Sequence, residues 1–440
     1  MQLQSRRRAP LSATLRALPR LLDARRGPIL SLQKRPATGA DPRFAHVHGW
    51  ARGATNRGGR PSRAHAGGSA LDWPHATAKA IGESVERSSV LRWEPSVVMA
   101  PAQALDVHAD LQALDLFHAD QRAEPGFPFK RIDEHSQLGW VPAYSLTRRQ
   151  AGFVPAALAH LYYEPRTEGD AFDTCPVSGY ACGNSLEEAL LSALYEVVER
   201  DAFMIAWYQR LAVPSLDLAS MKSAEARDAL KRFTPAPVRL YCSDLSTDVG
   251  IPAVMVMMTS NAPGWPAAAV ATAASWSLER AVVRALGELS SAHWLHRANP
   301  RRHLAMHEVL APQDHGLFYA QHSALPHLDR FLHPRSCRRA ATEATSADDE
   351  ENVLVLLNAA VLRLAERGLE AWALELTADD VAAEGLRVVK VIVPGMQPLD
   401  FGGSYRHLGG QRLYTAPVAM GHHTAARSPA GLNPAPHPFP

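Results

Sequence analysis

The sequence predicts a mixed α+β fold, a sandwich of helices and sheets around an internally duplicated core. Helix-like and strand-like stretches alternate along the chain, as they do in sheets covered by helices. The frame A-x-x-E-x-V-E-R occurs twice, at residues 80–87 and 193–200, each time in a helix-like stretch. Apolar residues make up 46% of the 440 residues, so the chain can bury the core of one large or two medium domains.

The helix that carries the second copy of the frame has a recognisable start. Ser185 is a suitable N-cap, and Glu188 three residues later completes a capping-box pattern. Downstream, residues 238–245 and 252–258 predict two paired strands, and residues 278–289 predict an amphipathic helix. The later elements are a charged loop, a helix ended by Gly368 and two strands, at 346–352, 353–368, 371–376 and 387–393.

Each copy of the frame places two carboxylates on one face of a helix, because residues three apart are neighbours there. The pairs are Glu83 with Glu86, and Glu196 with Glu199. Four carboxylates brought together repel one another unless a cation lies between them. Hard oxygen ligands suit Mg²⁺, which proteins often share with a nucleotide phosphate. The repeated frame therefore predicts a metal–phosphate site.

The surroundings of the second copy favour the same interpretation. Asn184 and Glu188 fall on the acidic front of the helix, opposite an apolar back, and no Lys follows to neutralise that front. Gly179 and Gly183 precede the helix, where backbone can approach a ligand closely. A simpler explanation is that the frame forms ordinary Glu-x-x-x-Arg surface pairs on a solvated face, and a single copy would favour it.

The stretch 178–203 resembles the signature of the YcaO superfamily, and more narrowly the cyclodehydratase (D-type) component of synthetases that make thiazole- and oxazole-modified peptides. The likeness begins near residue 20 and runs to the end of the chain. Its other segments are L-L-D-A-R-R-G-P-I-L-S-L (21–32), W-V-P-A-Y-S-L (140–146), F-V-P-A-A-L (153–158), D-H-G-L-F-Y-A (314–320), V-V-K-V-I-V-P-G-M-Q-P-L (388–399) and L-G-G-Q-R-L (408–413).

The resemblance implies ATP and Mg²⁺ as cofactors, bound between two ExxE-bearing helices. It assigns metal to Glu83, Glu86, Glu196 and Glu199, and nucleotide contacts to Asn184, Glu188 and Arg200. The implied reaction is the ring closure of Cys, Ser or Thr of a ribosomal precursor peptide, as in bacteriocin maturation. The side chain adds to the preceding amide, ATP phosphorylates the oxyanion, and phosphate leaves to give thiazoline or oxazoline.

The chain closes with alternating prolines at 434, 436, 438 and 440, a run that cannot be helix or join a sheet ladder. An extended, polyproline-like tail is expected. By resemblance, the carboxylate of Pro440 reaches the active site as a catalytic proton-transfer group. For an arbitrary chain, a frayed tail would be the simpler explanation.

Three departures from the family pattern bear on activity. Ser69 stands where a Lys is expected, and we expect Lys79, on the helical face of Glu83, to supply that charge; a surface Glu–Lys pair is the alternative. A-T-A-A-S at 271–275 replaces a Gly-containing block. S-S-A-H at 290–293 replaces a Gln-Arg segment, which leaves His293 as a weak substitute for a phosphate-binding Arg.

Charge and composition set the expected organisation. Residues 1–65 hold fourteen Lys and Arg against two Asp, which predicts a basic N-terminal extension, either a solvated segment or a surface for an acidic partner. Residues 66–425 are expected to form the ATP-binding cyclodehydratase domain, and 426–440 the Pro-rich tail. Four cysteines without CxxC spacing and no apolar run of membrane length indicate a cytoplasmic protein.

The expected partners are the precursor peptide and a separate E1-like, leader-binding protein, because that module is not visible in the chain. Neither a nucleic acid nor a membrane is expected, and a homodimer stays open. Two alternatives remain within peptide maturation, namely thioamide or amidine formation and a catalytically silent scaffold. A diiron or dimanganese carboxylate protein is disfavoured, since no Glu-x-x-His occurs in either helix.

Overall fold

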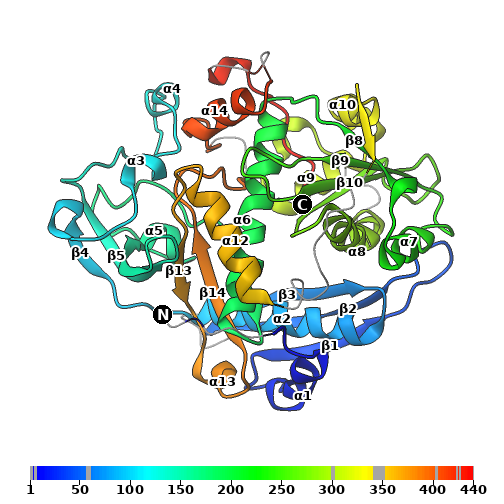
Figure 1. Cartoon of the computed structure of the whole chain (residues 1–440), viewed down its shortest axis with the longest axis horizontal. Helices are drawn as coiled ribbons and strands as arrows, with labels where there is room; N and C mark the ends of the chain where they lie inside the picture. The colour runs from blue at the N-terminus through cyan, green and yellow to red at the C-terminus, as the bar shows by residue number, and fades with distance from the viewer. Residues whose placement is uncertain are drawn as a thin grey trace.

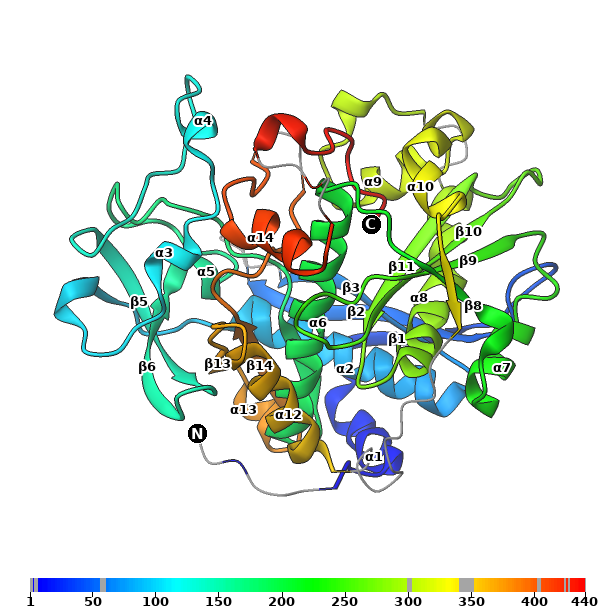
Figure 2. The same ribbon diagram turned by 45° about the horizontal axis from the view of Figure 1, so that its top comes forward.

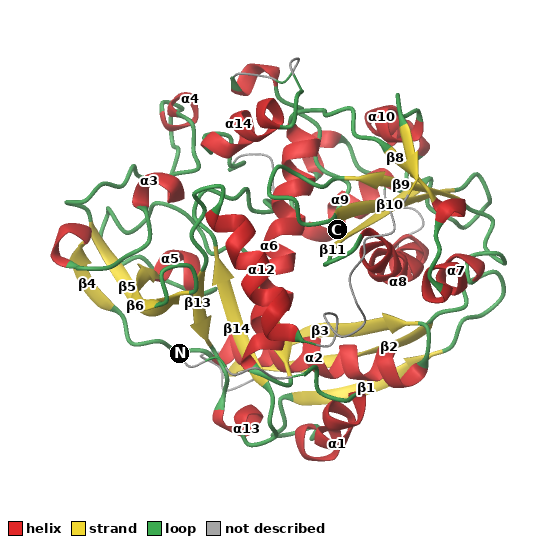
Figure 3. Ribbon diagram, in the orientation of Figure 1, coloured by secondary structure: helices red, strands yellow, loops and turns green. Residues whose placement is uncertain are grey.

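The computed structural model describes residues 3, 7–55, 61–298, 303–339, 352–401, 405–422, 425 and 428–439. Helices outweigh strands, and both are distributed along the chain (Figure 3). The α-helices are α1 Leu11–Leu21, α2 Trp73–Arg92, α3 Leu111–Leu114, α4 Ala119–Arg122, α5 Ala156–Ala159, α6 Leu186–Tyr208, α7 Ala224–Lys231, α8 Leu278–Ala298, α9 Pro312–Tyr319, α10 Asp329–Leu332, α12 Val353–Ala365, α13 Asp379–Ala382 and α14 Gln411–Ala419.

The strands are β1 Ile29–Arg35, β2 Ala45–Thr55, β3 Pro61–Ala70, β4 Val98–Pro101, β5 Gln137–Ser145, β6 Gln150–Pro155, β7 Tyr180–Gly183, β8 Ser215–Asp217, β9 Arg239–Asp244, β10 Ala253–Thr259, β11 Ala268–Ala274, β12 Cys337–Arg339, β13 Trp372–Glu375 and β14 Arg387–Ile392. They form three sheets. The orders are β1-β2-β3, β11-β10-β9-β8-β12 and β4-β5-β13-β14-β7, with β6 paired to β5.

Helix α6 runs through the middle of the molecule, between the sheet of β4, β5, β13 and β14 and the sheet of β8–β11 (Figures 1 and 2). It packs against β7 and β14 of one sheet, β10 and β11 of the other, and α12. A helix that is buried on nearly all sides needs apolar residues around its whole circumference. The stretch from Ala202 to Tyr208 supplies them, because all seven of its residues are buried.

The two copies of the repeated frame sit in matching strand–turn–helix units. In the first, β3 leads into α2, whose N-cap Asp72 accepts from the backbone N–H of His75. In the second, β7 leads into α6, whose N-cap Ser185 accepts from the backbone N–H of Glu188. Helix α2 covers β2 and β3 and also packs against β7. Strand β7 is therefore in contact with both frame-bearing helices.

Most elements expected from the sequence are present. The strands at 238–245 and 252–258 are β9 and β10, an antiparallel pair with Asp244 opposite Val254. The later strands are β13 and β14, and the last long helix ends near Gly368, whose φ of +70° closes it. The helix expected at 278–289 continues to residue 298 as α8. Of the expected charged loop at 346–352, only residue 352 lies within the described residues.

The N-terminal segment joins the folded body. Strands β1 and β2 pair with each other, and β2 pairs with β3 from Ala45–Ala70 to Thr55–Pro61. The expected boundary between residues 65 and 66 thus lies inside β3. In the part of the chain that the structure describes, no helix combines the length and the apolar character needed to cross a bilayer.

Candidate functional site

The first glutamate of each pair is held in the same way in both units. Glu83 accepts a hydrogen bond from the backbone N–H of Gly67 (2.6 Å) and from Arg87 (Nε, 2.9 Å). Glu196 accepts from the backbone N–H of Gly179 (3.0 Å) and from Arg200 (3.2 Å). A backbone N–H from the strand side and an arginine one turn along the helix therefore fix each carboxylate. The repeated sequence frame therefore forms the same local structure twice.

Position 179, which donates the N–H to Glu196, requires glycine. Its φ is +84°, a conformation that residues with a Cβ rarely adopt, and a Cβ would lie 2.3 Å from the carbonyl oxygen of Val391. Strand β14 thus approaches the loop before β7 so closely that only glycine fits. This close approach aims the Gly179 N–H at the carboxylate of Glu196.

The acidic pairs of the two helices interact electrostatically. Burial raises the pKa of Glu86 well above its usual value, and the charges of Glu196 and Glu83 raise it further. Burial also raises the pKa of Glu196, where Glu199 adds to the effect against Arg200. Among the described residues, the Glu86 carboxylate has no hydrogen bond or ion pair. The two distant copies of the frame therefore converge, and a cation would relieve their mutual repulsion.

Glu199 and Glu188 are buried on the same helix, at 7% and 8% exposure. Glu199 accepts from the hydroxyl of Thr272 (2.6 Å), which belongs to the departing segment 271–275. Glu188 accepts from the backbone N–H of Asn184 (3.1 Å) and of Ala9 (2.6 Å). The acidic front is thus no solvated face. The capping box is only half formed, because Glu188 reaches the N–H of Asn184 instead of that of Ser185.

Lys79 lies beside the residue that departs from the family pattern. Its ammonium donates to the carbonyl oxygen of Ser69 (2.9 Å) and is 3.6 Å from Glu288 of α8. The alternative pair with Glu83 is not formed, since Glu83 binds Arg87 and Gly67. Burial lowers the pKa of Lys79, and Arg284 and Arg280 lower it further against the effect of Glu288. Cations from α2 and α8 therefore gather near the start of α2.

Arg8 extends this cationic group toward α6. Burial lowers its pKa; Glu188 raises it, while Arg280 and Arg284 lower it further. Its guanidinium lies over the ring of Trp276 at 5.7 Å, as does that of Arg280. Positive charges held this close to one another attract an anion such as a phosphate. Sequence reasoning missed these three arginines, although Arg280 and Arg284 occupy one face of the predicted helix at 278–289.

His293 does not substitute for a phosphate-binding arginine. It is fully buried, donates from Nε2 to Asp41 at 3.1 Å, and stacks on Trp265 with ring centroids 4.7 Å apart. The expectation is wrong because these contacts hold the ring in the packing between α8 and the N-terminal segment. The arginines that lie electrostatically close to Lys79 are instead Arg284 and Arg280, about two and a half and three and a half turns earlier in α8.

The Pro-rich tail reaches this site. Phe439 packs on the guanidinium of Arg200 at 4.0 Å and lies 5.8 Å from the ring of Phe203. The tail is not frayed, because Ala435 and His437 are buried against α6 and its neighbours. Pro440 itself lies outside the described residues. A pocket of about 60 Å³, lined by Val197, Arg200, Lys390 and mostly apolar residues, adjoins the same face of α6.

The donor set fits Mg²⁺ held together with phosphate. Carboxylates are hard oxygen ligands, and Mg²⁺ is usually bound by one or two of them plus substrate phosphates. Within the described ranges, no group of three or more His, Cys, Asp or Glu side chains is close enough to cage an ion alone. A Glu86 carboxylate without a partner among the described residues, together with the cations of α8 near Lys79 and Arg8, matches a shared metal–phosphate site better than a closed protein cage.

A family model described as YcaO cyclodehydratase, ATP- and Mg²⁺-binding, matches residues 67–397. The chain belongs to the YcaO family. The cofactors of this family are ATP and Mg²⁺, and the matched residues contain both acidic pairs. The resemblance noted on the repeated frame is thereby confirmed, together with the expected mixed helix–sheet fold.

Solved structures of the family share the fold. A heterocyclase in complex with substrate and cofactor is 23% identical, with a TM-score of 0.79 over 100% of this chain and 59% of that chain. The heterocyclase TruD is 26% identical, with a TM-score of 0.63 over 83% of this chain and 52% of TruD. YcaO from Methanopyrus kandleri bound with AMPPCP and Mg²⁺ is 20% identical, with a TM-score of 0.63 and coverages of 88% and 91%. This YcaO chain thus spans little more than half of the two heterocyclases.

Proposed function

We propose that this YcaO protein is an ATP-dependent cyclodehydratase that forms thiazoline or oxazoline from Cys, Ser or Thr of a ribosomal precursor peptide. The observation that carries the proposal is the convergence of Glu86 and Glu196 from two identically built helix units. A peptide substrate and a precursor-delivering, E1-like partner protein belong to the proposal.

The side chains have distinct tasks in this proposal. Glu83, Glu86, Glu196 and Glu199 hold metal. Asn184, Glu188, Arg200 and Lys79 contact the nucleotide. Bound ATP with Mg²⁺ supplies phosphoryl activation of the peptide amide oxygen. The protein itself contributes position and charge, which is how phosphoryl transfer is generally catalysed.

Each support of the acids serves this task. Gly67 and Gly179 orient one oxygen of Glu83 and Glu196, while Arg87 and Arg200 neutralise part of their charge before cofactor binds. Thr272 fixes the Glu199 carboxylate by donating its hydroxyl proton to one oxygen. That oxygen keeps a second lone pair and the other oxygen stays available, because a carboxylate has about four acceptor sites.

The tail supplies the proposed proton-transfer group. We assign this role to the carboxylate of Pro440, and the position of Phe439 on Arg200 supports it. A positioned carboxylate contributes about 10²–10⁴ in rate as a general acid or base. Adding several residues after Pro440 should abolish ring formation and leave ATP binding unchanged. Full cyclisation activity in such an extended chain would contradict the assignment.

The proposed activity is tested by phosphate release in the presence of precursor peptide and partner protein. Wild type should release phosphate, the peptide should lose one water per ring, and Glu199→Gln should abolish both. If the peptide instead exchanges an amide oxygen for sulfur or nitrogen, the reaction is thioamide or amidine formation. Peptide maturation that survives Glu199→Gln would indicate a scaffold subunit.

A further inference from the structure

The C-terminal segment 433–439 is bound through its carbonyl groups. Proline lacks an N–H, so a segment with prolines at 434, 436 and 438 can offer its surroundings mainly acceptors. Side chains of the body donate to four of these acceptors. The bonds are Arg406 to Asn433 O (2.8 Å), Trp207 Nε1 to Ala435 O (3.0 Å), Tyr319 Oη to Pro436 O (2.7 Å) and His315 Nδ1 to His437 O (2.7 Å).

His437 is the one residue of this segment whose side chain makes both a polar and a stacking contact in the described structure. It is 3% exposed, and its Nε2 lies 2.6 Å from the carbonyl oxygen of Asp400. A carbonyl only accepts, so the proton is on Nε2. The ring stacks on His315 with centroids 4.1 Å apart and meets the edge of Phe203 at 5.9 Å. His437 thus fills a pocket made for a neutral imidazole.

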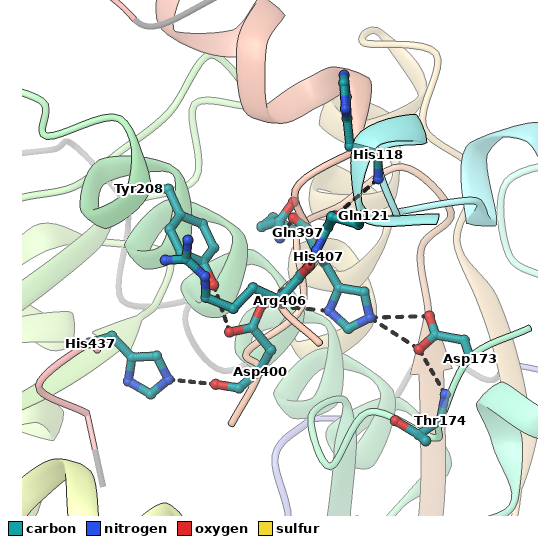
Figure 4. Close-up of polar contacts among 10 residues, drawn as sticks. All are labelled: His118, Gln121, Asp173, Thr174, Tyr208, Gln397, Asp400, Arg406, His407 and His437. Atoms are coloured by element: carbon teal, nitrogen blue, oxygen red, sulfur yellow. Dashed lines mark hydrogen bonds and ion pairs between the residues drawn. The ribbon is translucent and has the colours of Figure 1, made fainter. Parts of the chain in front are cut away.

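The acceptor for His437 is held by a buried network (Figure 4). One carboxylate oxygen of Asp400 accepts from the hydroxyl of Tyr208 at 2.6 Å, and the other from the backbone N–H of His407 at 3.0 Å. The ring of His407 in turn lies 3.1 Å from Asp173. A cavity of about 140 Å³ next to these groups is lined by the tail and by Tyr208, His315 and Arg406. The anchor point is therefore rigid.

The register of the segment decides what reaches the acids. Phe439, two residues beyond His437, packs on Arg200, which is paired with Glu196. A shift by one residue would move this contact by about 3 Å along an extended chain. Anchoring His437 therefore fixes the distance at which the tail meets Arg200.

We propose that the groove formed by α6, α9, Asp400 and Arg406 is a binding site for a proline-alternating peptide, here residues 428–439, and that His437 is the positioning residue that sets its register. Side-chain donors and stacked rings, not a shared sheet or helix, make almost all of the contacts. Binding is accordingly a separable event that the same sequence can perform as a free peptide. The positioning role rests on the proposed function, whereas the binding does not.

The test uses the full chain and a labelled peptide with the sequence of residues 428–440. The His437→Ala chain, whose own tail has lost its anchor, should bind this peptide, and wild type should not, because its own tail occupies the groove. A peptide carrying the same substitution should bind about tenfold more weakly or worse, the scale of one buried hydrogen bond and its packing. A Pro434→Ala peptide is the control, because residue 434 is exposed.

Positioning has its own readout. The wild-type peptide added to the His437→Ala chain should restore kcat for ring formation, with little change in the KM for ATP. His322→Ala, an exposed histidine that bonds Asn261 and none of the tail residues, is the control in the body. The inference is overturned if the His437→Ala chain does not bind the wild-type peptide. It is also overturned if that chain binds the wild-type peptide and the His437→Ala peptide equally well. Both outcomes hold whether or not the chain is a cyclodehydratase. If His437→Ala fails to fold, the isosteric Tyr319→Phe chain takes its place, and absence of binding there has the same meaning.

Discussion

Glu86 is the least well paired of the four frame glutamates among the described residues. Its carboxylate is half-buried, lies near two others and has no partner among the described residues, so burial and like charges raise its pKa. An acid whose pKa is raised in the folded state destabilises that state at pH values above its unfolded pKa. This arrangement serves a cofactor and not the fold.

Glu86→Gln should therefore raise the stability of the free protein at pH 8, by roughly 1 kcal/mol or more, since one pKa unit corresponds to about 1.4 kcal/mol. The same change should remove the extra stability that wild type gains from ATP with Mg²⁺. Thermal melts with and without both cofactors measure the two effects. Glu366→Gln, on an exposed helix end, is the matched control and should do neither. A destabilised Glu86→Gln chain would contradict this assignment.

Lys79 is the residue that we expect to replace the absent lysine at position 69. Its ammonium already lies on the Ser69 carbonyl, near Arg280 and Arg284. Lys79→Ala should raise the KM for ATP about tenfold, the scale of one charge-assisted contact, and change kcat less. Steady-state kinetics at varied ATP measure this. An unchanged KM would assign Lys79 to its ion pair with Glu288 alone.

At the scale of elements, Glu83 accepts a hydrogen bond from the backbone N–H of Gly67, and Glu196 accepts one from that of Gly179. Gly179→Ala should destabilise the fold by roughly 2 kcal/mol or more, because φ is positive and the Cβ meets Val391 O at 2.3 Å. It should also weaken ATP binding, since the clash displaces the N–H of residue 179 from the Glu196 carboxylate. Chemical denaturation and calorimetric titration measure the two effects. Gly82→Ala, in the open middle of α2, should instead stabilise by up to about 1 kcal/mol.

Sequence patterns predicted the elements better than the site. The frame, the N-cap Ser185 and the alternating apolar runs identify α2, α6, β9, β10, β13 and β14, because these signals are local. Thr272 and Arg8 were not predictable, since each reaches an acid only through tertiary packing. His293 was misassigned for the same reason. Its position relative to Glu288 indicated a phosphate contact, whereas the buried Asp41 beside it could not be foreseen.

At the scale of the whole molecule, His407, in the segment after β14, pairs with Asp173 in the loop before β7 and with Asp400, whose carbonyl oxygen accepts from His437 of the tail (Figure 4). Burial alone would lower its pKa, but Asp173 and Asp400 raise it from 6.5 to about 10. A raised pKa of a base means stability that is fully present below pH 6.5 and is lost as pH rises toward 10. The imidazolium thus links the segment after β14 to the loop before β7 at neutral pH.

Wild type should consequently lose roughly 2–4 kcal/mol of unfolding free energy between pH 6.5 and 10 through this group. His407→Gln should be less stable at pH 6.5 and show a flatter decline. Urea denaturation at several pH values measures both curves, with His322→Ala as a control that keeps the wild-type slope. Parallel curves for wild type and His407→Gln would remove the imidazolium from the account.

The most direct test is calorimetric titration of ATP in the presence of Mg²⁺ into wild type, Glu83→Gln, Glu199→Gln and the double variant. The two residues are on different helices and far apart in sequence. If both helices grip one cofactor, each single change weakens binding at least about tenfold, and the double change weakens it by less than the product of the two. Wild-type affinity in Glu83→Gln, or independent effects of the two changes, would contradict a shared site.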